Sequence, residues 1–258
     1  MKIDSNNNLS QLIAQSNRVL IFTGAGISTH SGIPDFRGPN GIWKKHQPVY
    51  YQDFLSREEA RIAYWNYKLE CWMAFRDALP NRVHEAIVEL EHAGKLEMLV
   101  TQNIDGLHKT AGTSASCLVE LHGTNHQAEC QQCYEKSDPA VHYHFFREKG
   151  SSPRCRCGGY IKIATISFGQ NLRQTDLIRA QHGARNADLV IALGSTLSVY
   201  PAASICLMAL EKGTPYIIIN QGPTEHDHLA GITLRLDGDV LDIFPPAVNQ
   251  ALKKNKLE

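Results

Sequence analysis

The chain has 258 residues, of which 43% are hydrophobic and 20% charged, an ordinary globular composition that excludes a disordered, collagen-like or coiled-coil protein. Its 26 basic and 26 acidic residues balance, so no overall charge attracts it to nucleic acid or to an anionic membrane. No apolar run reaches the roughly 18 residues of a membrane span, and the polar N-terminus lacks a signal-peptide core. We therefore expect a cytoplasmic protein with no membrane partner and no nucleic-acid partner.

Apolar patterns along the chain predict alternating strands and helices. Short apolar runs predict buried strands at 18–22, 96–101, 187–193 and 216–220. Helical spacing predicts helices at 9–16, 54–76, 82–93 and 202–212, and a frayed polar tail at 251–258. This alternation favours an α/β fold, a Rossmann-like parallel sheet with helices on both faces.

Two segments interrupt the alternation. Residues 42–80 form a predicted helical insert, whose aromatic side chains face the core or line an apolar ligand channel. Residues 126–160 carry four cysteines and few aliphatic residues, so they predict a small module that cannot build its own core. The remaining segments, 9–125 and 161–250, are expected to form the large domain of a single catalytic unit.

The cysteines of the second segment suit metal binding. They form a C-x-x-C pair and a tighter C-x-C pair, Cys130, Cys133, Cys155 and Cys157. In a reducing compartment four thiolates at such spacing predict a structural Zn²⁺ site, with disulfides or free thiols as the alternative.

A glycine-rich turn follows the first predicted strand. It contains Gly24, Ala25, Gly26 and Ser28, and such turns bring backbone N–H groups close to a phosphate. The third small residue of the dinucleotide fingerprint is missing, because Thr29 stands there, so an ordinary strand–helix turn is the alternative. The next loop carries a carboxylate, an aromatic ring and a guanidinium in succession: Asp35, Phe36 and Arg37.

Polar residues also follow the other predicted strands, where ligands bind in open α/β sheets. Gln102, Asn103, Ile104 and Asp105 suit recognition of a ribose and a carboxamide, although an Asx turn would explain them equally. His122 is a candidate general base. Candidate nucleotide contacts near the C-terminal strands are Gly194, Ser195, Thr196, Asn220, Gln221, Gly222 and Val240.

In order and spacing, these motifs resemble those of the sirtuin family of NAD-dependent protein-lysine deacylases, over about residues 19–240. The resemblance implies that Ala25, Asp35, Phe36 and Arg37 line an NAD pocket, with residues 36–45 as a mobile cofactor loop. It implies that Gln102, Asn103 and Asp105 hold the nicotinamide and its ribose, that His122 is the general base, and that the zinc is structural. The adenosine half would contact Ser195, Asn220 and Val240.

The implied reaction consumes NAD and an acylated lysine of a protein substrate. It gives nicotinamide, O-acyl-ADP-ribose and free lysine. The segment Ile166, Ser167, Phe168, Gly169 and Gln170 would form the substrate groove by main-chain pairing, although Ser167 and Gln170 depart from the family's usual pattern. Members that prefer acidic acyl groups carry a Tyr-x-x-Arg pair where Trp65 and Lys68 stand here. We therefore expect an acetyl group or a longer apolar acyl group.

Two other functions fit parts of the pattern. A mono-ADP-ribosyltransferase or an NAD glycohydrolase would use the same pocket and His122 with a different nucleophile. A non-catalytic NAD-sensing module is the more remote alternative, which the presence of His122, Asn103 and Asp105 disfavours.

Overall fold

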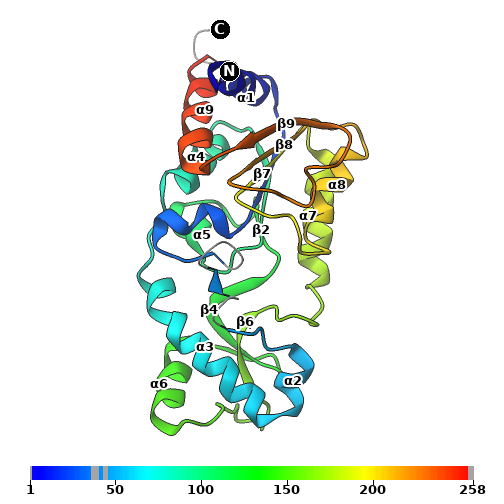
Figure 1. The fold of residues 1–258 in the computed structure, drawn as a ribbon. Coiled ribbons are helices and arrows are strands. Elements are labelled where there is room, and N and C mark those ends of the chain that lie inside the picture. Colours follow the sequence, from blue (N-terminus) through cyan, green and yellow to red (C-terminus); the bar gives the residue numbers. More distant parts are fainter. Residues whose placement is uncertain (1, 36–40, 43–45, 255–258) are drawn as a thin grey trace.

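The main element of the fold is a six-stranded parallel sheet. The computed structural model describes residues 2–35, 41–42 and 46–254 (Figure 1). The sheet has the order β3-β2-β1-β7-β8-β9, and every neighbouring pair is parallel. Its strands are β1 (Val19–Thr23), β2 (Leu96–Thr101), β3 (Leu118–Glu120), β7 (Leu189–Leu193), β8 (Tyr216–Asn220) and β9 (Ile232–Asp237).

Helices cover both faces of this sheet, which confirms the predicted Rossmann-like class. Every residue of β1, β7 and β8 is buried, as expected for strands with apolar side chains on both sides. The helices that pack on one face are α1 (Lys2–Gln15), α4 (Arg82–His92) and α9 (Val240–Lys254). Those on the other face are α7 (Gln174–Asn186) and α8 (Ser204–Leu210).

A second, smaller sheet lies at the other end of the molecule (Figure 1). Its three antiparallel strands are β5 (Lys136–Ser137), β4 (Gly123–Cys130) and β6 (Ile161–Thr165), in that order. The helices α2 (Tyr51–Ser56), α3 (Glu58–Asp77) and α6 (Pro139–Lys149) belong to the same end. Trp65 of α3 stacks on Phe146 of α6, with ring centroids 6.1 Å apart. The cysteine-bearing segment therefore shares one apolar core with the helical segment before it.

Several predicted boundaries differ from the structure. The helix predicted at 54–76 is two helices, because Arg57 has an extended backbone (φ −125°, ψ 133°). The helix predicted at 9–16 begins at Lys2. The frayed tail predicted at 251–258 is wrong at its start, because Ala251 is fully buried within α9; residues 255–258 lie outside the described residues. The helix predicted at 202–212 is the shorter α8.

The short helix α5 (Leu107–Ala111) and two 3₁₀ turns, Ala25–Ile27 and Thr29–Ser31, lie near the carboxyl ends of β2 and β1. Asn81 connects this region to α4. Its side chain accepts from the Val83 N–H and donates to the Ile27 carbonyl at 2.8 Å. One residue thus caps a helix and fixes the turn after β1. No helix within the described ranges is long and apolar enough to span a membrane.

Candidate active site

A cavity of about 890 Å³ opens at the carboxyl ends of the central parallel strands and extends toward the small sheet. The predicted NAD-binding residues that line it are Gly24, Ala25, Gly26, Asp35, Gln102, Asn103, Ile104, His122, Gly194, Ser195, Thr196, Asn220, Gln221, Gly222 and Val240. The predicted groove residues Ile166–Gln170 line the same cavity. Ser28 and Asp105 are buried behind its wall, and Phe36 and Arg37 fall outside the described residues.

The glycines of the turn after β1 are required because this turn packs closely against the backbone of the loop after β7. A Cβ atom on Gly24 would lie 2.7 Å from the Gly194 carbonyl oxygen, and one on Gly26 would lie 2.9 Å from the Gly194 Cα. Gly26 donates its N–H to the same carbonyl at 2.9 Å. Gly194 itself has a φ of +59°, which favours glycine. The loops after β1 and β7 therefore form one continuous wall on which a phosphate can approach the backbone.

Gln102 joins the ends of two strands that are not neighbours in the sheet. Its side-chain amide donates to the Ser195 hydroxyl at 2.8 Å, and that hydroxyl also accepts from the Leu197 N–H at 3.1 Å. The contact spans the carboxyl ends of β2 and β7, with β1 between them. The polar residues after these strands thus form a single surface in the cavity.

Asn103 and Asp105 are held by a shared hydroxyl. Ser28 donates to Asp105 Oδ2 at 2.8 Å and accepts from the Asn103 side-chain amide at 3.2 Å. Asn103 also donates to the Gly24 carbonyl at 3.1 Å, and Leu107 N–H donates to Asp105 Oδ1 at 2.9 Å. Burial raises the pKa of Asp105 from its ordinary value, although these hydrogen bonds oppose the rise. Asp105 therefore lies one layer behind the cavity and positions Asn103, which lines it.

His126 supports this loop from the small sheet. Its Nε2 lies 2.7 Å from the Asp105 carbonyl oxygen, and its ring covers Gly106, where a Cβ would lie 2.5 Å from the imidazole. Gly106 has a φ of +69° and is the residue before α5. Sequence analysis gave His126 no such role, because nothing in its local sequence relates it to residues 105–106.

The orientation of His122 suits a general base. Its Nδ1 lies 3.1 Å from the Gln102 carbonyl oxygen. Because a carbonyl can only accept, the neutral ring carries its proton on Nδ1 and its lone pair on Nε2. The His122 carbonyl accepts from the Ile166 N–H at 2.8 Å, so the histidine also holds the first residue of the predicted groove.

The groove segment is fixed at both ends. Ser167 N–H lies 3.1 Å from the Gln170 side-chain oxygen, and Gly169 has a φ of +78°. The Phe168 carbonyl accepts from the Tyr51 N–H at 2.9 Å, which joins the segment to the start of α2. Gln170 thus closes a turn of its own loop, a role that its sequence alone did not indicate.

The sequence predicted only part of the cavity wall that α3 forms. Tyr64, Tyr67 and Lys68 line the cavity, whereas Trp65 is fully buried in the core. Lys68 Nζ donates to Asn125 Oδ1 at 3.0 Å, and burial lowers the pKa of this amine to about 8. Asn125 comes from β4, so its contact with Lys68 depends on long-range packing that no local pattern reveals.

The four predicted zinc ligands gather at one point of the small sheet. Their Sγ atoms all lie within 4.8 Å of one another, with Cys130–Cys157 at 3.5 Å and Cys133–Cys155 at 3.7 Å. Tetrahedral zinc with Zn–S bonds of about 2.3 Å requires sulfur atoms about 3.8 Å apart. The C-x-C pair therefore contributes both sulfurs, and the four cysteines fit a structural Zn²⁺ site. No described cysteine forms a disulfide.

Comparison with known proteins agrees with this geometry. The sequence profile of the Sir2 family matches residues 24–201 of this chain. The chain belongs to the Sir2 family. An NAD-dependent protein deacetylase of Rhodopseudomonas palustris is 40% identical over 92% of this chain and 94% of its own length. An NAD-dependent protein deacylase 2 of Archaeoglobus fulgidus is 36% identical over 93% of this chain and 94% of its own.

Solved Sir2 structures share the whole fold. A structure of Sir2 with a p53 peptide and NAD⁺ has a TM-score of 0.83 and 32% identity, over 97% of this chain and 98% of that one. Another Sir2 structure, described in work on the mechanism and regulation of Sir2 enzymes, has a TM-score of 0.85 and 35% identity over 97% and 99%. The resemblance seen in the sequence is thus confirmed at the level of family and fold.

Proposed function

We propose that this Sir2 protein is an NAD-dependent protein-lysine deacylase that removes acetyl groups and transfers them to ADP-ribose. One observation carries the proposal: His122, with Nε2 as its basic atom, lines the same cavity as the glycine wall after β1 and the 166–170 groove. A dinucleotide and a peptide can therefore meet at one histidine. The relatives named as a protein deacetylase and a protein deacylase support the same assignment.

In the proposed reaction, NAD supplies the ribose C1′ that accepts the acyl oxygen as nicotinamide leaves. Asn103 orients the nicotinamide end, and Asp105 holds Asn103 through Ser28. His122 Nε2 then takes a proton from a ribose hydroxyl, which attacks the carbon of the acyl group. The bond from that carbon to the lysine nitrogen breaks, the amine leaves with a proton, and one water molecule completes O-acetyl-ADP-ribose. Water has to be kept from the ribose C1′ until the acyl oxygen has attacked it, since water would otherwise hydrolyse the sugar.

We propose that different segments of the chain have different roles in this reaction. Most of segments 9–125 and 161–250 forms the large domain that binds NAD, although β6 (Ile161–Thr165) and the start of β4 at Gly123 belong to the small sheet. Residues 126–160 form the zinc module, and residues 42–80 form the helical insert that contributes the α3 wall. We also assign the reaction to the cytoplasm, because thiolate ligation of zinc suits a reducing compartment.

Product analysis tests the proposal against its two enzymatic alternatives. Purified protein receives NAD and an acetyl-lysine peptide, and mass spectrometry follows nicotinamide, free peptide and ADP-ribose products together. We expect deacetylated peptide and O-acetyl-ADP-ribose in equal amounts. Release of nicotinamide with intact acetyl-peptide would refute deacylation and support ADP-ribosyl transfer or NAD hydrolysis. The same products are followed for His122→Ala, with His92→Ala, an exposed histidine at the end of α4, as its control.

A further inference from the structure

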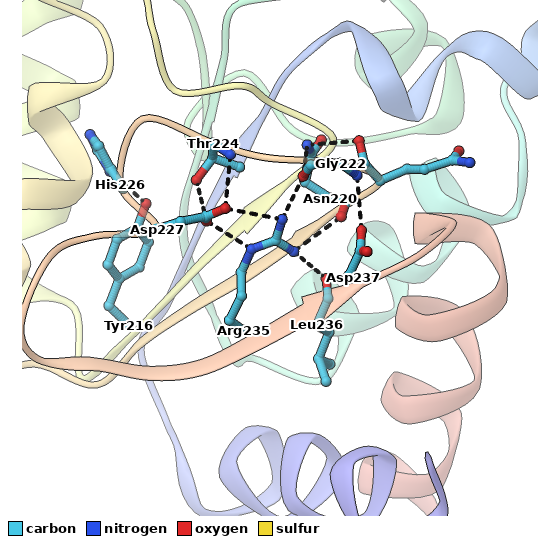
Figure 2. Close-up of polar contacts among 10 residues, drawn as sticks. Tyr216, Asn220, Gly222, Thr224, His226, Asp227, Arg235, Leu236 and Asp237 are labelled. Carbon is cyan, nitrogen blue, oxygen red and sulfur yellow. Dashed lines mark hydrogen bonds and ion pairs between the residues drawn. The ribbon is translucent and has the colours of Figure 1, made fainter. Parts of the chain in front are cut away.

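A cluster of four polar side chains, Arg235, Asp227, Thr224 and Asp237, lies beside the nucleotide end of the cavity, and none of the four is among the described residues that line it. Its centre is Arg235, whose strand pairs in parallel with β8 (Figure 2). Asn220, the last residue of β8, and the three residues that follow it line the cavity. Arg235 is not among the described residues of that lining. Its role must therefore be exerted through the backbone beside it.

Every N–H group of the Arg235 guanidinium has a hydrogen-bond acceptor. Nε and Nη2 face the carboxylate of Asp227, at 2.8 and 3.5 Å. Nη1 donates to the carbonyl oxygens of Asn220 (3.0 Å) and Leu236 (2.6 Å), and Nη2 donates to that of Gly222 (2.5 Å). A guanidinium has five such donors in a fixed plane, and Figure 2 shows all five used on this loop and its strand.

The carboxylate of Asp227 is fixed in turn by the loop itself. It accepts from the Thr224 N–H at 2.9 Å and from the Thr224 hydroxyl at 2.6 Å. Partial burial raises the pKa of Asp227, but the hydrogen bonds from Arg235 and Thr224 outweigh this and lower it below the ordinary value. Asp237 holds the same segment from the other side, because it accepts from the Gly222 N–H at 2.8 Å.

The loop between β8 and β9 also reaches the facing wall of the cavity. Glu225 N–H donates to the carbonyl of Thr196 at 2.9 Å, and His226 lies between the hydroxyls of Tyr200 (3.2 Å) and Tyr216 (3.0 Å). Thr196 and Tyr200 both line the cavity. One loop thus sets the distance between the two walls that follow β7 and β8.

We propose that Arg235 is a positioning residue for NAD: with Asp227 it holds residues 220–223 in the shape that receives the adenosine half of the dinucleotide. The inference rests on the proposed function, since it requires NAD to bind in this cavity. Arg235 touches neither the ligand nor the reacting atoms. Its loss weakens binding of the nucleotide and leaves the chemical step at His122 unchanged.

The test compares Arg235→Lys with Arg61→Lys. Arg61 is a matched control, because its guanidinium also holds two backbone carbonyls, of Phe54 and Leu55, and one carboxylate, of Glu58. It lies at the α2–α3 junction, outside the lining of the cavity. A lysine at either position keeps the charge but loses the planar set of donors.

For Arg235→Lys we expect the KM for NAD and the Kd for ADP-ribose to rise together by about ten-fold. The kcat at saturating NAD and the KM for the acetyl-peptide should stay within about two-fold of the wild-type values. Asp227→Asn should have a similar effect, and the double variant should be little worse than either single variant. Arg61→Lys should leave the Kd for ADP-ribose unchanged.

Calorimetry with ADP-ribose separates failure of this inference from failure of the proposed function. If the wild-type protein binds neither ADP-ribose nor NAD, the proposed function is wrong and the inference falls with it. If the wild-type protein binds ADP-ribose and Arg235→Lys binds it equally well, the inference alone is wrong. A fall in kcat with unchanged KM for NAD would also overturn it.

Discussion

Ser28 and Asp105 are 77 positions apart in the sequence, yet the serine hydroxyl lies 2.8 Å from the carboxylate Oδ2. The same hydroxyl accepts from the side chain of Asn103 at 3.2 Å. The loops after β1 and β2 are therefore joined by one buried polar contact. In the proposed enzyme this contact orients the residue that faces the nicotinamide.

Ser28→Ala removes that hydroxyl without adding volume. Asp105 then keeps the Leu107 N–H as a donor but loses its partner on the first loop, and Asn103 loses one acceptor. We expect kcat/KM for NAD to fall about ten- to a hundred-fold, because a buried carboxylate is left partly unsatisfied. The control is Ser16→Ala, a buried serine that bonds the Leu12 carbonyl far from the cavity. Equal activity of both variants would contradict the role given to Ser28.

Gly194→Ala should be severely destabilising. The new Cβ would lie 2.7 Å from the Ile27 nitrogen, in backbone contact that cannot yield, and the residue has a φ of +59°. Gly213→Ala is the matched control, because its φ is +77° but no atom lies within 4 Å of the added Cβ. We expect Gly213→Ala to cost about 1 kcal/mol from backbone strain alone, and Gly194→Ala to cost about 3 kcal/mol or more. Urea denaturation measures both.

Lys68 gives the protein a predicted pH dependence in the alkaline range. Burial lowers its pKa from 10.5 to about 8, so between these values the unfolded chain binds more protons than the folded protein. The free energy of unfolding should therefore rise with pH between about 8 and 10.5, as far as Lys68 determines it. Lys68→Met should remove the share of this rise that Lys68 contributes and stabilise the protein at pH 7 by about 1–3 kcal/mol, because the penalty for burying the ammonium disappears.

Denaturation curves at several pH values test this prediction. Lys162 contributes a parallel effect, since burial and the nearby Lys68 lower its pKa to about 7. Lys162 should therefore still titrate in the Lys68→Met variant, at a higher pH than before. An unchanged slope of stability against pH in Lys68→Met would show that Lys68 is not the buried base inferred here.

Substitution of Cys157, one of the four predicted zinc ligands, should empty the zinc site and loosen the segment around it. Cys157→Ser should lower bound zinc from one equivalent per chain toward none, and it should expose the segment around Cys130–Cys157 to proteolysis. Cys117→Ser, a half-buried cysteine outside the cluster, is the control and should retain zinc. Elemental analysis decides the result, and full zinc content in Cys157→Ser would contradict the four-cysteine site.

The central parallel sheet was predictable because its strands are continuous apolar runs. The segments Leu96–Thr101 and Tyr216–Asn220 are strands with the expected bounds. The strand β4 was not predicted because its sequence, GTNHQAEC, is mostly polar. Of its buried residues, Ala128 packs in the core cluster that contains the aromatic residues of α3 and α6. The helix α9 was missed because Pro245 and Pro246 interrupt a pattern that otherwise presents Phe244, Val248 and Ala251 to the core.

The site was predictable where its chemistry lies in short motifs. The functional groups can be recognised from short stretches of sequence at 24–28, at 102–105 and at His122. The parallel sheet brings the strand ends that carry them together. Asn125, His126 and Arg235 were not predicted as site residues, since each acts through a partner more than ten residues away in the sequence. Such contacts exist only in the folded chain, and residue type alone does not indicate them.

The most direct test of the account is the behaviour of His122→Ala in two assays on the same preparation. One assay measures deacetylation of a peptide, and the other measures exchange of labelled nicotinamide into NAD in the presence of that peptide. If His122 acts as base only after nicotinamide has left, deacetylation should fall at least about a hundred-fold while exchange persists. Deacetylation at the wild-type rate in His122→Ala would contradict the account.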